Sequence, residues 1–238
     1  MEGKTVNWMD VFIIIIIAIN GLKGLSIGLV LSFFSIASFI AAGIIAKIYY
    51  PMLSQFILEK TNLISEIYGF VFQKIAVFAK DNPQIQGASE KNIYEIMNFP
   101  KTLSNFLIKS NGMKQYSEEV MNNIYGYVSE IITRMVVDLI SIVIIFLIAK
   151  LILNIIGKVL DSIASLPIIN QFNRLGGLLF GTLKGALIVL ILFALMVPAA
   201  SIFPSSFIVE GLNNSSLAKY FYDYNIILNM LGSFIDFR

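Results

Sequence analysis

The chain has 238 residues, of which 57% are hydrophobic and only 13% are charged, a balance far from that of soluble globular domains. It has no cysteine and no histidine, which excludes disulfides, thiol nucleophiles, cysteine–histidine zinc clusters and imidazole proton relays. The formal net charge is only +2, and the basic residues are scattered along the chain instead of clustered. Nucleic-acid binding is therefore not expected.

Four apolar segments approach or reach the roughly 20 residues that a helix needs to cross a bilayer core. The first two, residues 8–22 and 24–46, follow one another closely, and so do the last two, residues 135–157 and 175–203. The sequence therefore predicts an all-α polytopic membrane protein with four transmembrane helices in two hairpins. A secretory signal peptide is the alternative for the first segment, but no small-residue cleavage site follows it and a full span begins at once.

The region between the two hairpins, residues 51–134, is more polar than the spans. Two stretches in it, residues 62–80 and 114–134, carry apolar residues at helical spacing with charges between them. We expect both to form amphipathic helices that lie on the membrane or on each other.

A tail follows the last span, and residues 217–237 again have the pattern of an interfacial segment. Tyr220, Tyr222 and Tyr224 are suited to the headgroup region of a membrane. The predicted organisation is a first hairpin (1–50), an extracytoplasmic helical insert (51–134), a second hairpin (135–203) and an interfacial C-terminal tail (204–238).

Basic residues in the short connections predict the orientation of the hairpins. The connection in the second hairpin carries Lys158 and Arg174 against one acid, Asp161, and the connection in the first carries Lys23 and no acid. Both connections are expected to be cytoplasmic. The N-terminus, the insert and the C-terminus are then extracytoplasmic.

The two hairpins share a pattern. Asp10 and Asp138 stand near the outer end of the first helix of each hairpin, and the tripeptide LKG recurs at residues 22–24 and 183–185 near the start of the second helix. A parallel internal repeat, as found in many transporters, would account for this pattern. Coincidence among common residues would also account for it.

Glycines recur at helical spacing around the predicted connections. Small residues let two backbones approach closely in a membrane, where packing holds helices together, although glycine is also simply frequent in membrane helices. A phosphate-binding loop is not expected, because no strand precedes these glycines and the Walker pattern is absent. The predicted packing residues are Gly24, Gly28, Gly177, Gly181 and Gly185.

Polar residues within the spans are functional candidates by default. The two aspartates could face each other, or hold a cation, at the outer ends of spans one and three, but at that depth they could equally anchor helix ends. Lysines 150, 158 and 184 are expected to extend to the cytoplasmic face, and Asn154 could hydrogen-bond across helices. Asn173 and Arg174 could hold a lipid phosphate or a partner, although the positive-inside rule explains Arg174 equally well. The candidate polar, ion or partner site contains Asp10, Asp138, Asn154, Asn173, Arg174 and Lys184.

Two stretches, residues 7–51 and 166–193, carry ordered motifs. The first has an aromatic residue, an acid, an apolar helix and a basic-Gly-x-x-x-Gly turn into a second span. The second has the pattern Asn-Arg-x-x-Gly-x-x-x-Gly-x-x-Lys/Arg-Gly before the last span. The residues of these motifs are Trp8, Asp10, Lys23, Gly24, Gly28, Asn173, Arg174, Gly177, Gly181, Lys184 and Gly185. In their order and spacing, the two stretches resemble the CvpA (colicin V production protein) family.

The chain also departs from the family pattern. Ser26 and Ile27 stand where members often carry further basic residues, so the resemblance does not support a dense basic patch at the first turn. The insert at residues 51–134 is long compared with that of compact family members, so the resemblance assigns no role to its residues.

The resemblance implies an integral protein of the bacterial cytoplasmic membrane, linked to production or export of a peptide toxin and to envelope homeostasis. The sequence contains no evident carboxylate pair, nucleophile–base set or metal cluster, so we expect no catalytic residues, metal or cofactor, and no enzyme activity. The expected partners are membrane lipids and either a second copy of the chain or other envelope and export proteins. The alternative is a small oligomeric transporter or channel with Asp10 and Asp138 in its pathway.

Overall fold

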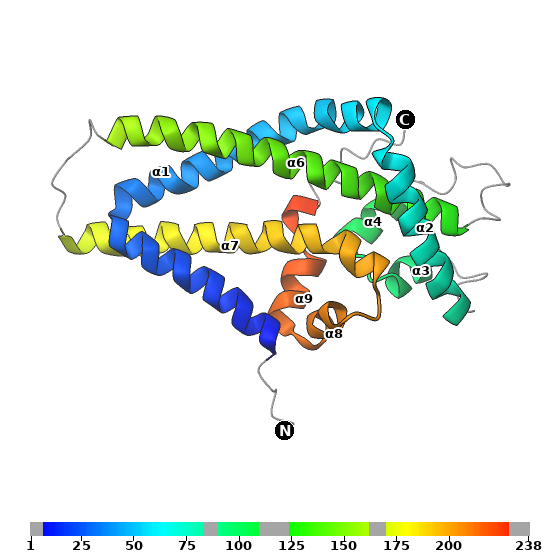
Figure 1. Ribbon diagram of the computed structural model, residues 1–238. Helices are drawn as coiled ribbons and strands as arrows, with labels where there is room; N and C mark the ends of the chain where they lie inside the picture. Colours follow the sequence, from blue (N-terminus) through cyan, green and yellow to red (C-terminus); the bar gives the residue numbers. More distant parts are fainter. Residues whose placement is uncertain (1–6, 83–89, 110–123, 162–169, 229–238) are drawn as a thin grey trace, which may run out of the picture. The chain divides into compact units, whose positions relative to one another are not determined.

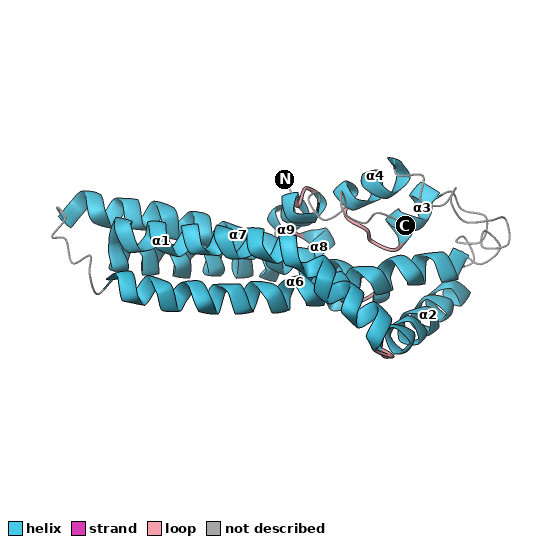
Figure 2. Ribbon diagram, turned by 90° about the horizontal axis from the view of Figure 1, so that it is seen from above, coloured by secondary structure: helices cyan, strands magenta, loops and turns pink. Residues whose placement is uncertain are grey.

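The computed structural model describes residues 7–82, 90–109, 124–161 and 170–228 (Figure 1). Every regular element in these ranges is a helix, which confirms the predicted all-α class (Figure 2). The helices are α1 (Trp8–Lys60), α2 (Leu63–Asp81), α3 (Glu90–Ile96), α4 (Lys101–Lys109), α6 (Ile124–Asp161), α7 (Asn170–Ile202), α8 (Phe207–Asn214) and α9 (Ser216–Asp223).

Within the described ranges, three helices are long and apolar enough to cross a membrane: α1, α6 and α7. Large apolar side chains such as Ile48, Leu151 and Leu175 are exposed along them. A contiguous apolar surface of this kind suits a lipid environment rather than water. The first two predicted spans are both parts of α1.

Helix α1 is broken at Gly28. This residue has φ 83° and ψ 175°, a conformation that is essentially restricted to glycine. The ribbon of α1 turns sharply in this part of the chain (Figure 1). We call residues 8–27 the first arm of α1 and residues 29–60 its second arm.

The position of this turn corrects the sequence analysis, which began the second span at Gly24. Gly28 has the non-helical dihedral angles, so Gly24 belongs to the first arm. A Gly-x-x-x-Gly pair does not reveal which member leaves the helix, because either glycine can adopt a positive φ.

Helix α6 continues without a break through residue 135, where the sequence analysis placed the start of the third span. Residues 124–134 of the predicted amphipathic stretch therefore form the first turns of the apolar helix and are not a separate helix. Residues 114–123 of that stretch lie outside the described residues. The other predicted amphipathic stretch, residues 62–80, corresponds to α2.

The chain divides into two compact units. Unit 1 contains Met1–Val11, Thr61–Val136 and Leu190–Arg238, and unit 2 contains Phe12–Lys60 and Val137–Val189. Unit 1 therefore holds the short helices together with the first residues of α1, the first turns of α6 and the last turns of α7. Unit 2 holds the rest of these three apolar helices.

Burial in unit 1 corrects one expectation for the tail. Tyr220 and Tyr224 are exposed, as an interfacial position requires, but Tyr222 is only 3% exposed and its hydroxyl donates to the carbonyl oxygen of Asn98 at 2.7 Å. Burial, together with the neighbouring Asp223, raises the pKa of the Tyr222 hydroxyl well above its usual value. This hydroxyl is therefore an internal hydrogen-bond donor rather than a headgroup contact.

Candidate functional site

The first arm of α1 packs against α7 in unit 2 through glycine. A Cβ atom added to Gly24 would lie 2.1 Å from the carbonyl oxygen of Gly177, and one added to Gly177 would lie 2.2 Å from the carbonyl oxygen of Gly24. One added to Gly181 would lie 2.3 Å from the carbonyl oxygen of Asn20. Because the obstructing atoms belong to the backbone, no side chain can move aside to make room.

This contact follows a regular register along the two helices. The nearest residues to Gly177, Gly181 and Gly185 on the first arm are, in turn, Gly24, Asn20 and Ile17. Residue numbers in these pairs rise along α7 and fall along the first arm, so the first arm and α7 are antiparallel. The structure thus brings the predicted packing glycines of the two helices together.

The side chain of Asn173, from α7, occupies the break in α1. Its Oδ1 atom accepts a hydrogen bond from the backbone N–H of Leu29 at 2.6 Å, where the second arm begins. Its amide is so close to Gly28 that an added Cβ there would lie 2.5 Å from Nδ2. A second hydrogen bond spans the break, since the Ser32 hydroxyl of the second arm donates to the carbonyl oxygen of Gly24 in the first arm at 3.2 Å.

Asn173 therefore caps a helix to which it does not belong. Asparagine is a favoured N-cap because its side-chain oxygen can satisfy a free N–H of the first turn. The sequence analysis proposed that Asn173 holds a lipid phosphate or a partner. In the structure its side-chain oxygen bonds the protein's own backbone.

Two lysines, one from α6 and one from α7, converge on serines of the second arm. The ammonium of Lys184 donates to the Ser35 hydroxyl at 2.8 Å. The ammonium of Lys150 donates to the Ser38 hydroxyl at 2.5 Å and to the carbonyl oxygen of Ser35 at 3.4 Å. We call these four residues the lysine–serine cluster.

The lysine–serine cluster has positive charge without a carboxylate to balance it. Both lysines are half-buried, and neither has an acidic partner among the described residues. The sequence analysis expected both side chains to extend to the cytoplasmic face. In the structure their ammonium groups donate to oxygens of Ser35 and Ser38. Burying a charge is costly unless it is paired or fully hydrogen-bonded.

Sequence reasoning missed three members of this cluster: Ser35, Ser38 and Lys150. One available signal was the recurrence of serine at positions 32, 35 and 38, since residues three apart lie on one side of a helix. The chain has no evident motif that would assign the lysines to that side.

Asp10 connects the start of α1 to the tail within unit 1. Its Oδ1 accepts hydrogen bonds from the Ser215 hydroxyl and, at 3.3 Å, from the backbone N–H of Leu217 in the first turn of α9. Two neighbours add to this contact. The Asn7 side chain donates to the carbonyl oxygen of Gly211 at 2.6 Å, and the Trp8 ring stacks on that of Phe207 at 5.0 Å.

Asp138 belongs to unit 2 and has a different partner, because the Ser54 hydroxyl donates to its Oδ1 at 2.5 Å. Each aspartate is thus hydrogen-bonded within its own unit. The remaining candidates, Asn154 on α6 and Arg174 on α7, are exposed, and the described residues provide no hydrogen-bond partner for either side chain.

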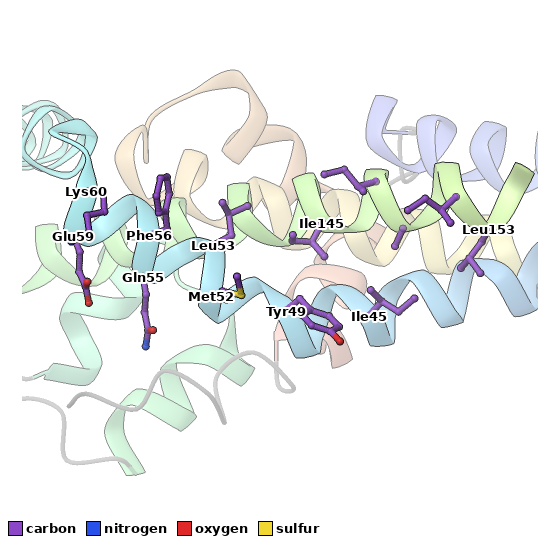
Figure 3. A pocket seen from close by; sticks show the side chains of 13 residues that line it. Ile45, Tyr49, Met52, Leu53, Gln55, Phe56, Glu59, Lys60, Ile145 and Leu153 are labelled. Carbon is purple, nitrogen blue, oxygen red and sulfur yellow. The ribbon is translucent and has the colours of Figure 1, made fainter.

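A groove of about 680 Å³ lies between the second arm of α1 and α6 in unit 2 (Figure 3). Its lining is mostly apolar, and side chains such as Met52, Tyr49 and Phe56 are well exposed there. The polar side chains of Gln55, Glu59 and Lys60 lie toward one end (Figure 3). The surface suits lipid acyl chains. Periodicity alone could not reveal it, because neither helix has one apolar face distinct from a polar one.

Long apolar helices with lipid-compatible surfaces, packed through glycine, define an α-helical membrane protein. The sequence model of one family, described as Colicin V production protein, matches residues 9–79 and 113–225, which is most of the chain. The chain therefore belongs to the Colicin V production protein family, and the resemblance is confirmed. The match also includes residues 51–79 and 113–134 of the insert, a region in which the sequence motifs had no counterpart. Among curated proteins and among solved structures, neither comparison finds a match.

Proposed function

We propose that this protein is a non-enzymatic protein of the bacterial cytoplasmic membrane that supports production or export of a peptide toxin and envelope homeostasis. Membership of the Colicin V production protein family carries the proposal. The glycine-packed helices support a scaffold role, in which lipids and either a second copy or other envelope and export proteins are the partners. Nucleic acid is not among the proposed partners.

Deleting the gene in a toxin-producing host tests this role. We expect secreted toxin activity to fall and sensitivity to detergent to rise, and both to be restored by the wild-type gene. Toxin retained inside the cells would indicate a role in export, whereas a loss inside and outside would indicate a role in production. Unchanged secretion together with an unchanged envelope would contradict the proposal.

We further propose that α1 forms two spans, so that the chain crosses the membrane four times in two hairpins. The chain leaves unit 1 after residue 11 and returns at 61, then leaves after 136 and returns at 190. As one straight helix, residues 12–60 would measure about 70 Å, against about 30 Å for a bilayer core. The break at Gly28 supports a turn back into the membrane.

Reporter fusions test this topology. Because the contacts between the start of α1 and the tail join these segments on one side, both ends are expected outside the cytoplasm. A reporter fused after Arg238 should be active only outside, and one inserted in the connection at residues 162–169 only inside. A cytoplasmic signal from the C-terminal fusion would overturn the orientation, and signals from both fusions on one side would overturn the second hairpin.

The alternative of a small oligomeric transporter or channel with Asp10 and Asp138 in its pathway receives less support. Each carboxylate accepts a serine hydroxyl from its own unit, and Asp10 also bonds the first turn of α9. These contacts favour anchoring of helix ends over binding of a transported cation.

A further inference from the structure

The lysine–serine cluster of unit 2 brings two cationic groups together among the three long apolar helices. We propose that Lys150 and Lys184, with Ser35 and Ser38, bind a phosphate-type oxyanion, supplied either by the headgroup of an anionic lipid or by free phosphate. The inference requires only that unit 2 lies in a membrane. It does not depend on a role in toxin production.

The first argument is the unbalanced charge. An ammonium group has three N–H donors and a full positive charge, and hydroxyl and carbonyl oxygens satisfy donors without cancelling the charge. Neither Lys150 nor Lys184 has a carboxylate partner among the described residues. Intramembrane charges pair with one another or with backbone carbonyls and mark substrate or ion pathways, so they are functional candidates by default.

The second argument is convergence. Lys184 bonds the hydroxyl of Ser35 while Lys150 bonds the carbonyl oxygen of the same residue, so ammonium groups from two helices meet at one point of a third. The two charges repel each other, and the repulsion is strong where water is scarce. A phosphate oxyanion between them would turn this repulsion into two charge-assisted hydrogen bonds.

The third argument concerns the direction from which the anion arrives. Lys23 is exposed on the first arm, just before the Gly28 break, and its charge also acts on Lys184. Lys23 lies near the turn of the first hairpin, at the end that the distribution of basic residues assigns to the cytoplasmic side. Headgroups of the inner leaflet and cytoplasmic phosphate are both present on that side.

Ligand titration of the purified full chain in a mild neutral detergent tests the site. The probes are inorganic phosphate, dihexanoyl phosphatidylglycerol and, as a lipid without net charge, dihexanoyl phosphatidylcholine, each followed by the melting temperature. At least one anionic probe should raise the melting temperature saturably, since a ligand that binds only the folded state stabilises it. A rise with phosphatidylglycerol alone identifies a lipid headgroup, and a rise with phosphate identifies the free anion.

Variants assign the effect to the cluster. Lys184→Gln and Lys150→Gln should each weaken the apparent affinity by about tenfold or more, because each removes a charged hydrogen bond. Lys184→Arg keeps the charge and should retain most of the affinity. Lys80→Gln, which removes an exposed lysine of α2 that lines neither the cluster nor the groove, is the control and should leave the affinity unchanged.

Three results would overturn the site. The first is the absence of a saturable rise with either anionic probe in the wild type, a test that holds even if a variant fails to fold. The second is an equal rise with phosphatidylcholine and phosphatidylglycerol. The third is an equal loss of affinity in Lys80→Gln and Lys184→Gln. Toxin secretion is not a readout here, so failure of this site and failure of the proposed function remain distinguishable.

Discussion

Gly24→Ala is expected to destabilise the helix bundle of unit 2 by about 2 kcal/mol or more, at the upper end of the usual cost of overpacking. The added methyl group would lie 2.1 Å from the carbonyl oxygen of Gly177, and relief requires the first arm and α7 to move apart. Thermal unfolding in detergent, followed by circular dichroism, measures the effect as a lower melting temperature.

Gly43→Ala is the matched control because it lies in the same helix and a Cβ there meets nothing within 4 Å. Alanine is the better helix former, so this variant should be neutral or more stable by up to about 1 kcal/mol. Gly177→Ala places a methyl group in the same contact between the first arm and α7, but from the α7 side. If Gly24→Ala and Gly177→Ala cause the same separation, the double variant should lose less stability than the sum of the two. Equal melting temperatures for Gly24→Ala and Gly43→Ala would rule out the glycine contact.

Gly28→Ala is expected to have the second large effect, for a different reason. The φ of 83° with ψ of 175° costs a side-chain-bearing residue about 1–3 kcal/mol. The new methyl group would also lie 2.5 Å from the Asn173 amide. The melting temperature of Gly28→Ala should therefore fall well below that of Gly43→Ala.

A double-mutant cycle with Asn173→Ala separates the two causes. By itself, Asn173→Ala should cost about 1 kcal/mol, the typical value of a lost N-cap. In the Asn173→Ala background the steric clash is absent, so Gly28→Ala should cost less than it does in the wild type while the backbone strain persists. If Gly28→Ala costs the same in both backgrounds, Asn173 does not occupy the break as described.

Periodicity predicted the helical class and the glycines that would meet, because four-residue spacing places small residues on one side of a helix whatever they contact. It could not decide between Gly24 and Gly28 as the turning point, since either glycine can adopt a positive φ and only the structure shows that Gly28 does so. The lysine–serine cluster was unpredictable for a related reason. A lysine can extend to an interface or turn inward, and the choice depends on which acceptors the neighbouring helices present.

Two other predictions were wrong: the start of a separate helix near residue 135 and the interfacial position of Tyr222. The boundary predicted near residue 135 rested on a change from mixed to apolar composition, but a helix can continue through such a change, as α6 does. Tyr222 has the same composition signal as Tyr220 and Tyr224, and its burial depends on its contact with Asn98, which is distant in sequence. Each miss was decided by a contact or a continuation that local sequence does not encode.

The cap at the Gly28 break imposes an order on the biogenesis of unit 2. Leu29 and Asn173 are 144 residues apart, and the glycines that face the first arm follow Asn173 along α7. Because synthesis proceeds from the N-terminus, both arms of α1 emerge long before their cap and their packing surface exist. During that interval the first arm has no α7 against which to pack, and the N–H of Leu29 must find a temporary acceptor in water, lipid headgroups or the insertion machinery. Insertion of α7 is therefore the step that provides α1 with its cap at Leu29 and with the surface against which its first arm packs.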